Sequence, residues 1–225
     1  MATEVLVVNP AYPESLAIKK AVSLLKAGRL VVFPTETVYG LAADAFNSEA
    51  VAKVFEAKGR TFSKPLAVCI SSLSDLDFLV EEIPDFAKEL VKHYLPGPLT
   101  LILRKKKGVP VFTTRTDLSK PDEETIAIRY PSNKIFLSII NSIKCPLVLT
   151  SANISGGKSP TTFDELYAEM KGKVDLIIDG GRTELRIEST VINTTVSPPR
   201  ILREGAISAR ELEDFYKKWE SQIRK

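Results

Sequence analysis

Short apolar runs alternate with longer amphipathic stretches along this chain. The apolar runs are rich in β-branched residues and are bounded by glycine, proline or polar turns, a pattern typical of buried strands. We expect strands at residues 30–33, 66–70, 99–103, 125–129, 146–149, 174–178, 188–192 and 200–205. Apolar positions at helical spacing predict helices at residues 13–27, 47–58, 133–143, from about 163, and 208–220, with two more between residues 71 and 94.

Helices and strands interleave, and this order predicts an α/β fold. The expected architecture is a twisted mixed sheet of parallel and antiparallel strands with helices on its faces. Residues suited to cap helices stand at three expected starts: Asn47 or Ser48, Asn133, and Ser208 with Glu211 as a capping box. No internal repeat divides the sequence, so we expect a single domain over residues 1–225.

Composition excludes several classes of protein. The 225 residues are 44% hydrophobic and 26% charged, which is ordinary for a globular protein, and the net charge of +3 favours anionic ligands without being diagnostic of nucleic-acid binding. His93 is the single histidine, which counts against a Ser-His-Asp triad and a histidine-rich metal site. Cys69 and Cys145 lie in apolar runs and are expected to be buried free thiols. Without a leader pattern or a long apolar run, the expected location is the cytoplasm, with no membrane partner.

Four expected strands end in polar residues. These ends are Thr35-Glu36-Thr37, Arg129, residues 150–153 and residues 179–181. Each of them alone is better explained as a solvated loop, but α/β sheets bind ligands at strand ends, and their combination predicts one cleft. Such a cleft would hold hydroxyls and arginines and hardly any general base.

A cleft of this kind suits positioning and charge neutralisation, the main tasks in phosphoryl or nucleotidyl transfer. Lys58, Arg60 and Arg203 would cover phosphates, and Arg129 could grip a carboxylate with two hydrogen bonds. The cations at 58 and 60 have a simpler explanation too, because positive charge is favoured at the end of a helix.

Three loops need separate treatment. Residues 152–159 fit a relaxed phosphate-loop pattern, but Pro160 disfavours a helix starting at Ser159, so we reject that match. Residues 113–124 are polar and without periodicity, as in lids or mobile loops. The run of cations at 104–107 is interpreted first as a solvated turn, with contact to tRNA phosphates as the minor alternative.

Eight motifs occur in order between residues 31 and 205: PTETVYGLA, KGR followed by KPL, IAIRYP, SAN, SP, DGG, EST and LREG. Together they resemble the YrdC-type threonylcarbamoyl-AMP synthase family in its short form. The resemblance implies a fold built around a deep basic cavity. It also implies a reaction in which L-threonine, bicarbonate and ATP give threonylcarbamoyl-adenylate and pyrophosphate. A partner transferase then passes the threonylcarbamoyl group to tRNA.

The resemblance also implies roles for individual residues. Threonine would be bound by Thr35, Thr37, Arg129 and Ser189. The nucleotide would be bound by Lys58, Arg60, Lys64, Thr125, Ser151, Asn153, Ser159 and Arg203, with Lys58 and Arg60 acting on the phosphates as the catalytic pair. The implied cofactor is Mg²⁺, held mainly by the phosphate oxygens of ATP and without protein ligands.

Two positions depart from the family pattern: Cys69 stands where many relatives have histidine, and Lys64 where they have asparagine. The first puts in doubt a polar contact with threonine, and the second would add charge near the nucleotide. The alternative to an enzyme is an RNA-binding YrdC/YciO-like module without this activity, or a scaffold that keeps only the fold. The KGR and SAN motifs favour catalysis.

Overall fold

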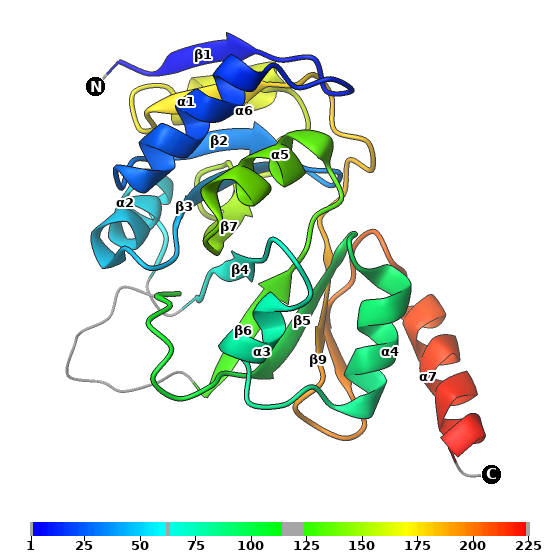
Figure 1. Cartoon of the computed structure of the whole chain (residues 1–225). Coiled ribbons are helices and arrows are strands. Elements are labelled where there is room, and N and C mark those ends of the chain that lie inside the picture. Colours follow the sequence, from blue (N-terminus) through cyan, green and yellow to red (C-terminus); the bar gives the residue numbers. More distant parts are fainter. Residues whose placement is uncertain (1, 62–63, 114–123, 224–225) are drawn as a thin grey trace.

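The computed structural model describes residues 2–61, 64–113 and 124–223 (Figure 1). Within these ranges the chain forms one sheet in the order β1-β8-β2-β3-β7-β4-β6-β5-β9-β10. The strands are β1 Glu4–Val7, β2 Val31–Pro34, β3 Tyr39–Asp44, β4 Ala67–Cys69, β5 Leu99–Arg104, β6 Thr125–Arg129, β7 Leu147–Ser151, β8 Leu176–Asp179, β9 Thr190–Asn193 and β10 Arg200–Arg203. The expected lid, residues 113–124, lies outside the described residues except for its two ends.

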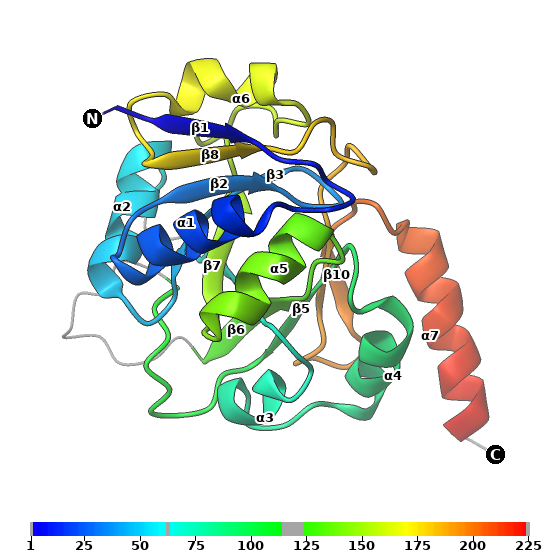
Figure 2. The ribbon, with the colours of Figure 1, turned by 45° about the horizontal axis from the view of Figure 1, so that its top comes forward.

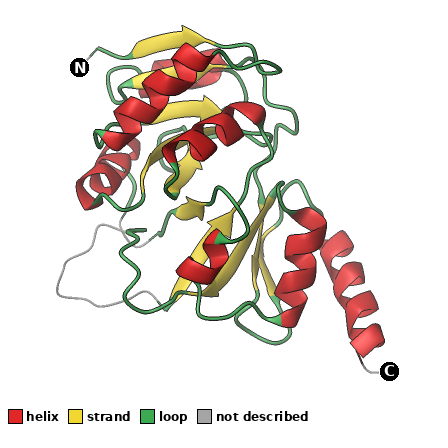
Figure 3. Ribbon diagram, in the orientation of Figure 1, coloured by secondary structure: helices red, strands yellow, loops and turns green. Residues whose placement is uncertain are grey.

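Parallel and antiparallel neighbours are mixed, as predicted. β2 pairs with β8 in parallel and with β3 antiparallel, and β6 pairs with β4 in parallel and with β5 antiparallel. In Figure 3 the strands around β2 run across the view, whereas β5, β6 and β9 run nearly upright, so the sheet twists strongly between its two halves.

Seven helices occur in the described residues: α1 Ser15–Lys26, α2 Ser48–Lys58, α3 Asp75–Leu79, α4 Asp85–Tyr94, α5 Lys134–Ile143, α6 Phe163–Met170 and α7 Ala209–Ile223. Asn47 caps α2 by accepting from the Ala50 amide at 3.0 Å, and Asn133 caps α5 by accepting from Ile135 at 2.9 Å. Ser208 Oγ accepts from the Glu211 amide at 3.2 Å, which is the Ser208 half of the expected capping box. The predicted helix starts are therefore confirmed. None of the described helices combines the length and the apolar character that crossing a bilayer requires.

Both faces of the upper half of the sheet are covered by helices. Val31 and Phe33 on β2 pack against α1 and α5, whereas Val32 packs into the core that includes α2 and α6. Figure 2 shows α1 and α5 lying across the strands, with α6 at the top of the view above β1. Burial on both faces explains why these strands are continuous apolar runs instead of alternating sequences.

In the lower half of the sheet, helices cover only one of the two faces. These helices are α3, α4 and α7. Leu99, Leu101 and Leu103 on β5 point into that core, and their neighbours Thr100 and Ile102 line the cavity on the opposite face. Side chains alternate between faces along a strand, so a single run of sequence supplies both the core and the site.

Two strands were not predicted. β3 has the sequence YGLAAD, in which glycine and alanine have poor strand propensity, but it is fully paired with β2 on one side and β7 on the other. β1 is a short edge strand that pairs only with β8 among the described residues. In β3, pairing with buried neighbours outweighs local propensity.

Candidate active site

A cavity of about 500 Å³ lies on the uncovered face of the sheet's lower half. Its wall includes ten of the residues expected at the site: Thr35, Lys58, Arg60, Lys64, Thr125, Arg129, Ser151, Asn153, Ser189 and Arg203. Five of the lining side chains are cationic (Lys58, Arg60, Lys64, Arg129 and Arg203), and Glu188 is the one carboxylate among the described lining residues. An excess of positive charge around a small cavity favours an anionic ligand.

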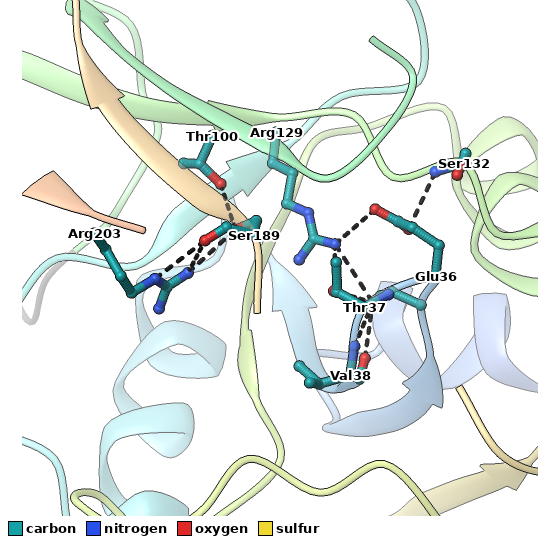
Figure 4. A network of polar contacts seen from close by, with 9 residues as sticks. Glu36, Thr37, Val38, Thr100, Arg129, Ser132, Ser189 and Arg203 are labelled. Atoms are coloured by element: carbon teal, nitrogen blue, oxygen red, sulfur yellow. Dashed lines mark hydrogen bonds and ion pairs between the residues drawn. The ribbon is translucent and has the colours of Figure 1, made fainter. Parts of the chain in front are cut away.

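Arg129, the last residue of β6, is held in a buried cluster (Figure 4). Its Nη2 atom donates to Glu36 Oε1 at 2.8 Å and to Thr37 Oγ1 at 2.6 Å, with a longer contact to Thr35 Oγ1 at 3.4 Å. Arg129 Nε is buried and makes no hydrogen bond within the described part of the chain. The guanidinium is therefore fixed through Nη2, and Arg129 forms part of the cavity wall.

The turn between β2 and β3 brings Thr35 and Glu36 to this position. Pro34 ends β2, and Thr35 Oγ1 donates to the Val38 carbonyl at 2.7 Å while accepting from the Thr37 amide at 3.2 Å. A threonine hydroxyl bonding its own turn stabilises the turn locally. Glu36 Oε2 also accepts from the Ser132 amide at 3.2 Å, which ties the carboxylate to the segment after β6.

Ser189 lies on the other side of the cavity, directly before β9. Its Oγ atom is 2.9 Å from Thr100 Oγ1 and accepts from Arg203 Nη2 at 3.1 Å. Arg203 donates to the Ser189 carbonyl through Nε and Nη2, and its Nη1 pairs with Glu188 Oε2 at 2.9 Å. The hydroxyl of Ser189 is thus oriented by two neighbours (Figure 4).

Lys58 and Arg60 occupy different environments although they are two residues apart. Lys58 Nζ contacts the Ser151 carbonyl and the Asn153 carbonyl and side-chain oxygens, and the side chain is almost entirely buried. Burial, and secondarily the charge of Arg60, lowers the pKa of Lys58 to about 8. Arg60 follows Gly59, which ends α2 in the left-handed conformation at φ 58°.

Arg60 is partly exposed and anchored through backbone carbonyls. Its Nε donates to the Lys64 carbonyl at 2.9 Å and Nη2 to the Pro65 carbonyl at 3.1 Å. Partial burial and then the nearby charge of Arg203 lower the pKa of Arg60 below its usual value. An anion placed between these two guanidiniums would relieve the repulsion.

The structure departs from the expected site in three places. Thr37 is fully buried behind Arg129 and does not line the cavity, and Ser159 lies outside the lining and bonds Glu188 Oε1. Asp179 does not join the cavity either: it accepts from the Tyr39 hydroxyl at 3.3 Å and the Gly181 amide at 2.9 Å. The expectation that residues 179–181 join the cleft was wrong, because this strand end supports β3 from behind.

Sequence reasoning missed three contributors. Thr100 and Glu188 were assigned no role, and Glu36 was noted only as one carboxylate in the turn. Thr100 sits on an apolar strand, where a single hydroxyl gives little signal. For Glu36 the signal was present, because a carboxylate between two hydroxyls at a strand end is suited to hold an arginine.

Both cysteines are free, as predicted, but only Cys69 is buried, and Cys145 is half-buried. Cys69 is fully buried in the core cluster that also contains residues of α1 and α5. It is not part of the cavity wall, and burial raises the pKa of its thiol to about 12. Cys69, which stands where many relatives have histidine, therefore packs in the core as an unreactive thiol. In the described residues no three His, Cys, Asp or Glu side chains are grouped to hold a metal ion.

The fold and the site define an α/β protein whose mixed sheet carries a cavity lined by cations and hydroxyls, which is suited to a small anionic ligand. Residues 23–205 match the Sua5/YciO/YrdC family model, described as "Telomere recombination", and the chain belongs to this family.

Three known proteins show the relationship in detail. Threonylcarbamoyl-AMP synthase of Pyrococcus abyssi is 44% identical over 89% of this chain and 57% of its own length. The crystal structure of P. abyssi Sua5 complexed with L-threonine has a TM-score of 0.86, covering 94% of this chain and 60% of that one. E. coli YciO is 26% identical with a TM-score of 0.78, covering 90% and 96%. The chain thus spans a little over half the length of the first of these relatives.

Proposed function

We propose that this protein is an L-threonylcarbamoyladenylate synthase, a nucleotidyltransferase that makes threonylcarbamoyl-AMP and pyrophosphate from L-threonine, bicarbonate and ATP. The observation that carries the proposal is the placement of Arg129. Its guanidinium is held by Glu36 and Thr37, and Arg129 lines the same cavity as Arg60 and Arg203. An amino-acid carboxylate and a polyphosphate therefore have separate cationic partners within one small space. The similarity to threonylcarbamoyl-AMP synthase of P. abyssi and to P. abyssi Sua5 complexed with L-threonine supports the same activity.

In the proposed complex the carboxylate of threonine lies on Arg129, between the Thr35 and Ser189 sides of the cavity. The threonine amine forms a bond to the carbon of bicarbonate, and water leaves to give the carbamate. One carbamate oxygen then attacks the α-phosphorus of ATP, and the bond to the β-phosphate breaks to release pyrophosphate. The protein's part is to align the two substrates and to stabilise phosphate charge through Arg60 and Arg203.

The remaining predicted nucleotide contacts, Lys64, Thr125, Ser151 and Asn153, line the cavity and fit this arrangement. Magnesium is proposed to enter with ATP and to be held mainly by phosphate oxygens, and when bound it neutralises charge on the departing pyrophosphate. We further propose a cytoplasmic protein whose product is consumed by a threonylcarbamoyl transferase that modifies tRNA.

The test is pyrophosphate release from ATP by the purified chain. The proposal requires that release depend on both threonine and bicarbonate. Threonine-independent hydrolysis of ATP would contradict it, as would salt-sensitive RNA binding without turnover, the behaviour of an RNA-binding module. The Arg129→Ala variant serves as the internal control. A synthase should lose pyrophosphate release in this variant, whereas the RNA binding of a module without turnover should be unchanged.

A further inference from the structure

Lys58 closes α2, and its side chain is only 1% exposed. Its ammonium has three N–H donors. Three oxygens surround it: the Ser151 carbonyl, the Asn153 carbonyl at 2.7 Å and Asn153 Oδ1 at 3.2 Å. The number of donors equals the number of acceptors, and all three acceptors belong to the end of β7 and the loop that follows it.

The loop after β7 also donates a hydrogen bond to Lys58. The Lys58 carbonyl, free at the helix end, accepts from the Ser155 amide at 2.8 Å. Residues 151–155 therefore wrap around Lys58, with their carbonyls on its ammonium and an amide on its carbonyl.

Asn153 extends this arrangement through the loop. Its Oδ1 atom accepts from Ser151 Oγ at 2.6 Å, and its Nδ2 atom donates to the Ile154 carbonyl at 2.9 Å and to the Gly157 carbonyl at 2.7 Å. The side chain that receives Lys58 is thus the one that shapes residues 151–157. Ser151, Asn153, Ser155, Gly156 and Gly157 all line the cavity.

We propose that Lys58 is a positioning residue, which holds residues 151–157 in the conformation that faces the cavity and does not itself bind the anionic ligand. Cationic contact with that ligand falls to the other cations of the cavity wall, Arg60 and Arg203 foremost. This differs from the role that family resemblance implies for Lys58, and only its consequence for nucleotide binding rests on the proposed function.

Arg60 provides the contrast. It is partly exposed, lines the cavity and has a guanidinium with five donors, of which the bonds to the Lys64 and Pro65 carbonyls use two. A planar guanidinium with donors on several sides is suited to phosphate oxygens. The two cations of the KGR motif thus have different roles: Lys58 holds residues 151–157 in place, and Arg60 faces the ligand.

Hydrogen exchange of the free protein tests the proposal without any ligand. Lys58→Met keeps the apolar stem and removes the three donors, and we expect the amides of residues 154–157 to exchange about tenfold faster or more. The matched control is Lys53→Met on the same helix, whose ammonium donates to the Gly28 carbonyl at 2.9 Å outside the cavity. This control should leave the loop amides as in wild type. Unchanged exchange in Lys58→Met would overturn the proposal.

A second measurement uses the wild-type protein and stays informative if Lys58→Met fails to fold. With ¹⁵N-labelled lysine, the buried ammonium of Lys58 is expected to give a slowly exchanging NH₃⁺ signal that hardly moves when ATP is added. A large shift, or a coupling from ¹⁵N to ³¹P, would make Lys58 a phosphate ligand and overturn the proposal. If wild type binds no ATP while Lys58→Met loosens the loop, the positioning role stands and the proposed function fails.

Discussion

Arg129 and Glu36 form a buried ion pair with Nη2 and Oε1 2.8 Å apart, and their side chains are 8% and 3% exposed. The pair joins the turn after β2 to the end of β6, two segments separated by more than ninety residues in the chain. Removing one partner of a buried pair leaves the other charge without compensation, whereas an exposed pair contributes little.

Glu36→Ala should therefore lower the free energy of unfolding by about 3–5 kcal/mol, measured by urea denaturation. Glu36→Gln should cost less, since the amide oxygen can still accept from Arg129. The control is Asp85→Asn, which breaks the exposed pair with Lys88 and should not change stability measurably. Equal effects of Glu36→Ala and Asp85→Asn would mean that the pair does not hold the turn in place.

Arg129→Lys should weaken threonine binding more than ATP binding. Lysine keeps the charge but loses the planar fork of donors, so we expect KM for threonine to rise about 10- to 100-fold while KM for ATP changes little. Steady-state pyrophosphate release with each substrate varied in turn measures this. A parallel rise in both KM values would place Arg129 at the nucleotide instead.

Valine tests whether the cavity recognises the hydroxyl of threonine, because it replaces that hydroxyl with a methyl group of similar size. Ser189 and Thr100 place oriented hydroxyls at the cavity wall. A site that hydrogen-bonds the substrate hydroxyl leaves buried polar groups unpaired with valine, so kcat/KM should fall at least about 100-fold. Comparable rates with valine and threonine would show that recognition rests on the carboxylate alone.

Lys58 should make the free energy of unfolding depend on pH in the alkaline range. Burial lowers the pKa of Lys58 from 10.5 to about 8, with Arg60 adding to the shift and Glu169 and Glu188 opposing it. Between these two values the unfolded chain binds more protons than the native one, so this residue makes the free energy of unfolding rise with pH. The difference between wild type and Lys58→Met should grow from pH 8 to 10. A flat difference would show that Lys58 titrates normally.

Much of the fold could be predicted because its determinants are local. Asn47 and Asn133 cap the helices they were expected to cap, and β-branched runs such as Val31–Pro34 became buried strands. Such local patterns do not determine the order of the strands in the sheet. Tyr39–Asp44 has weak strand propensity and is defined by its neighbours on both sides.

The site was predictable to the extent that function requires particular side chains at strand ends. Thr35 and Arg129 could be placed together because each follows an apolar run. The partner of Arg129 and the burial of Lys58 depend on distances across the sheet, which periodicity does not encode. For the same reason Asp179 looked like a site residue although it supports Tyr39.

The most direct measurement is a crystal structure of the protein with L-threonine and a non-hydrolysable ATP analogue. The account predicts that the threonine carboxylate lies on Arg129 and the threonine hydroxyl near Ser189. It places the phosphates beside Arg60 and Arg203, in the same cavity lined by β5 and β6. Threonine bound elsewhere, or phosphates bound to Arg129, would contradict it.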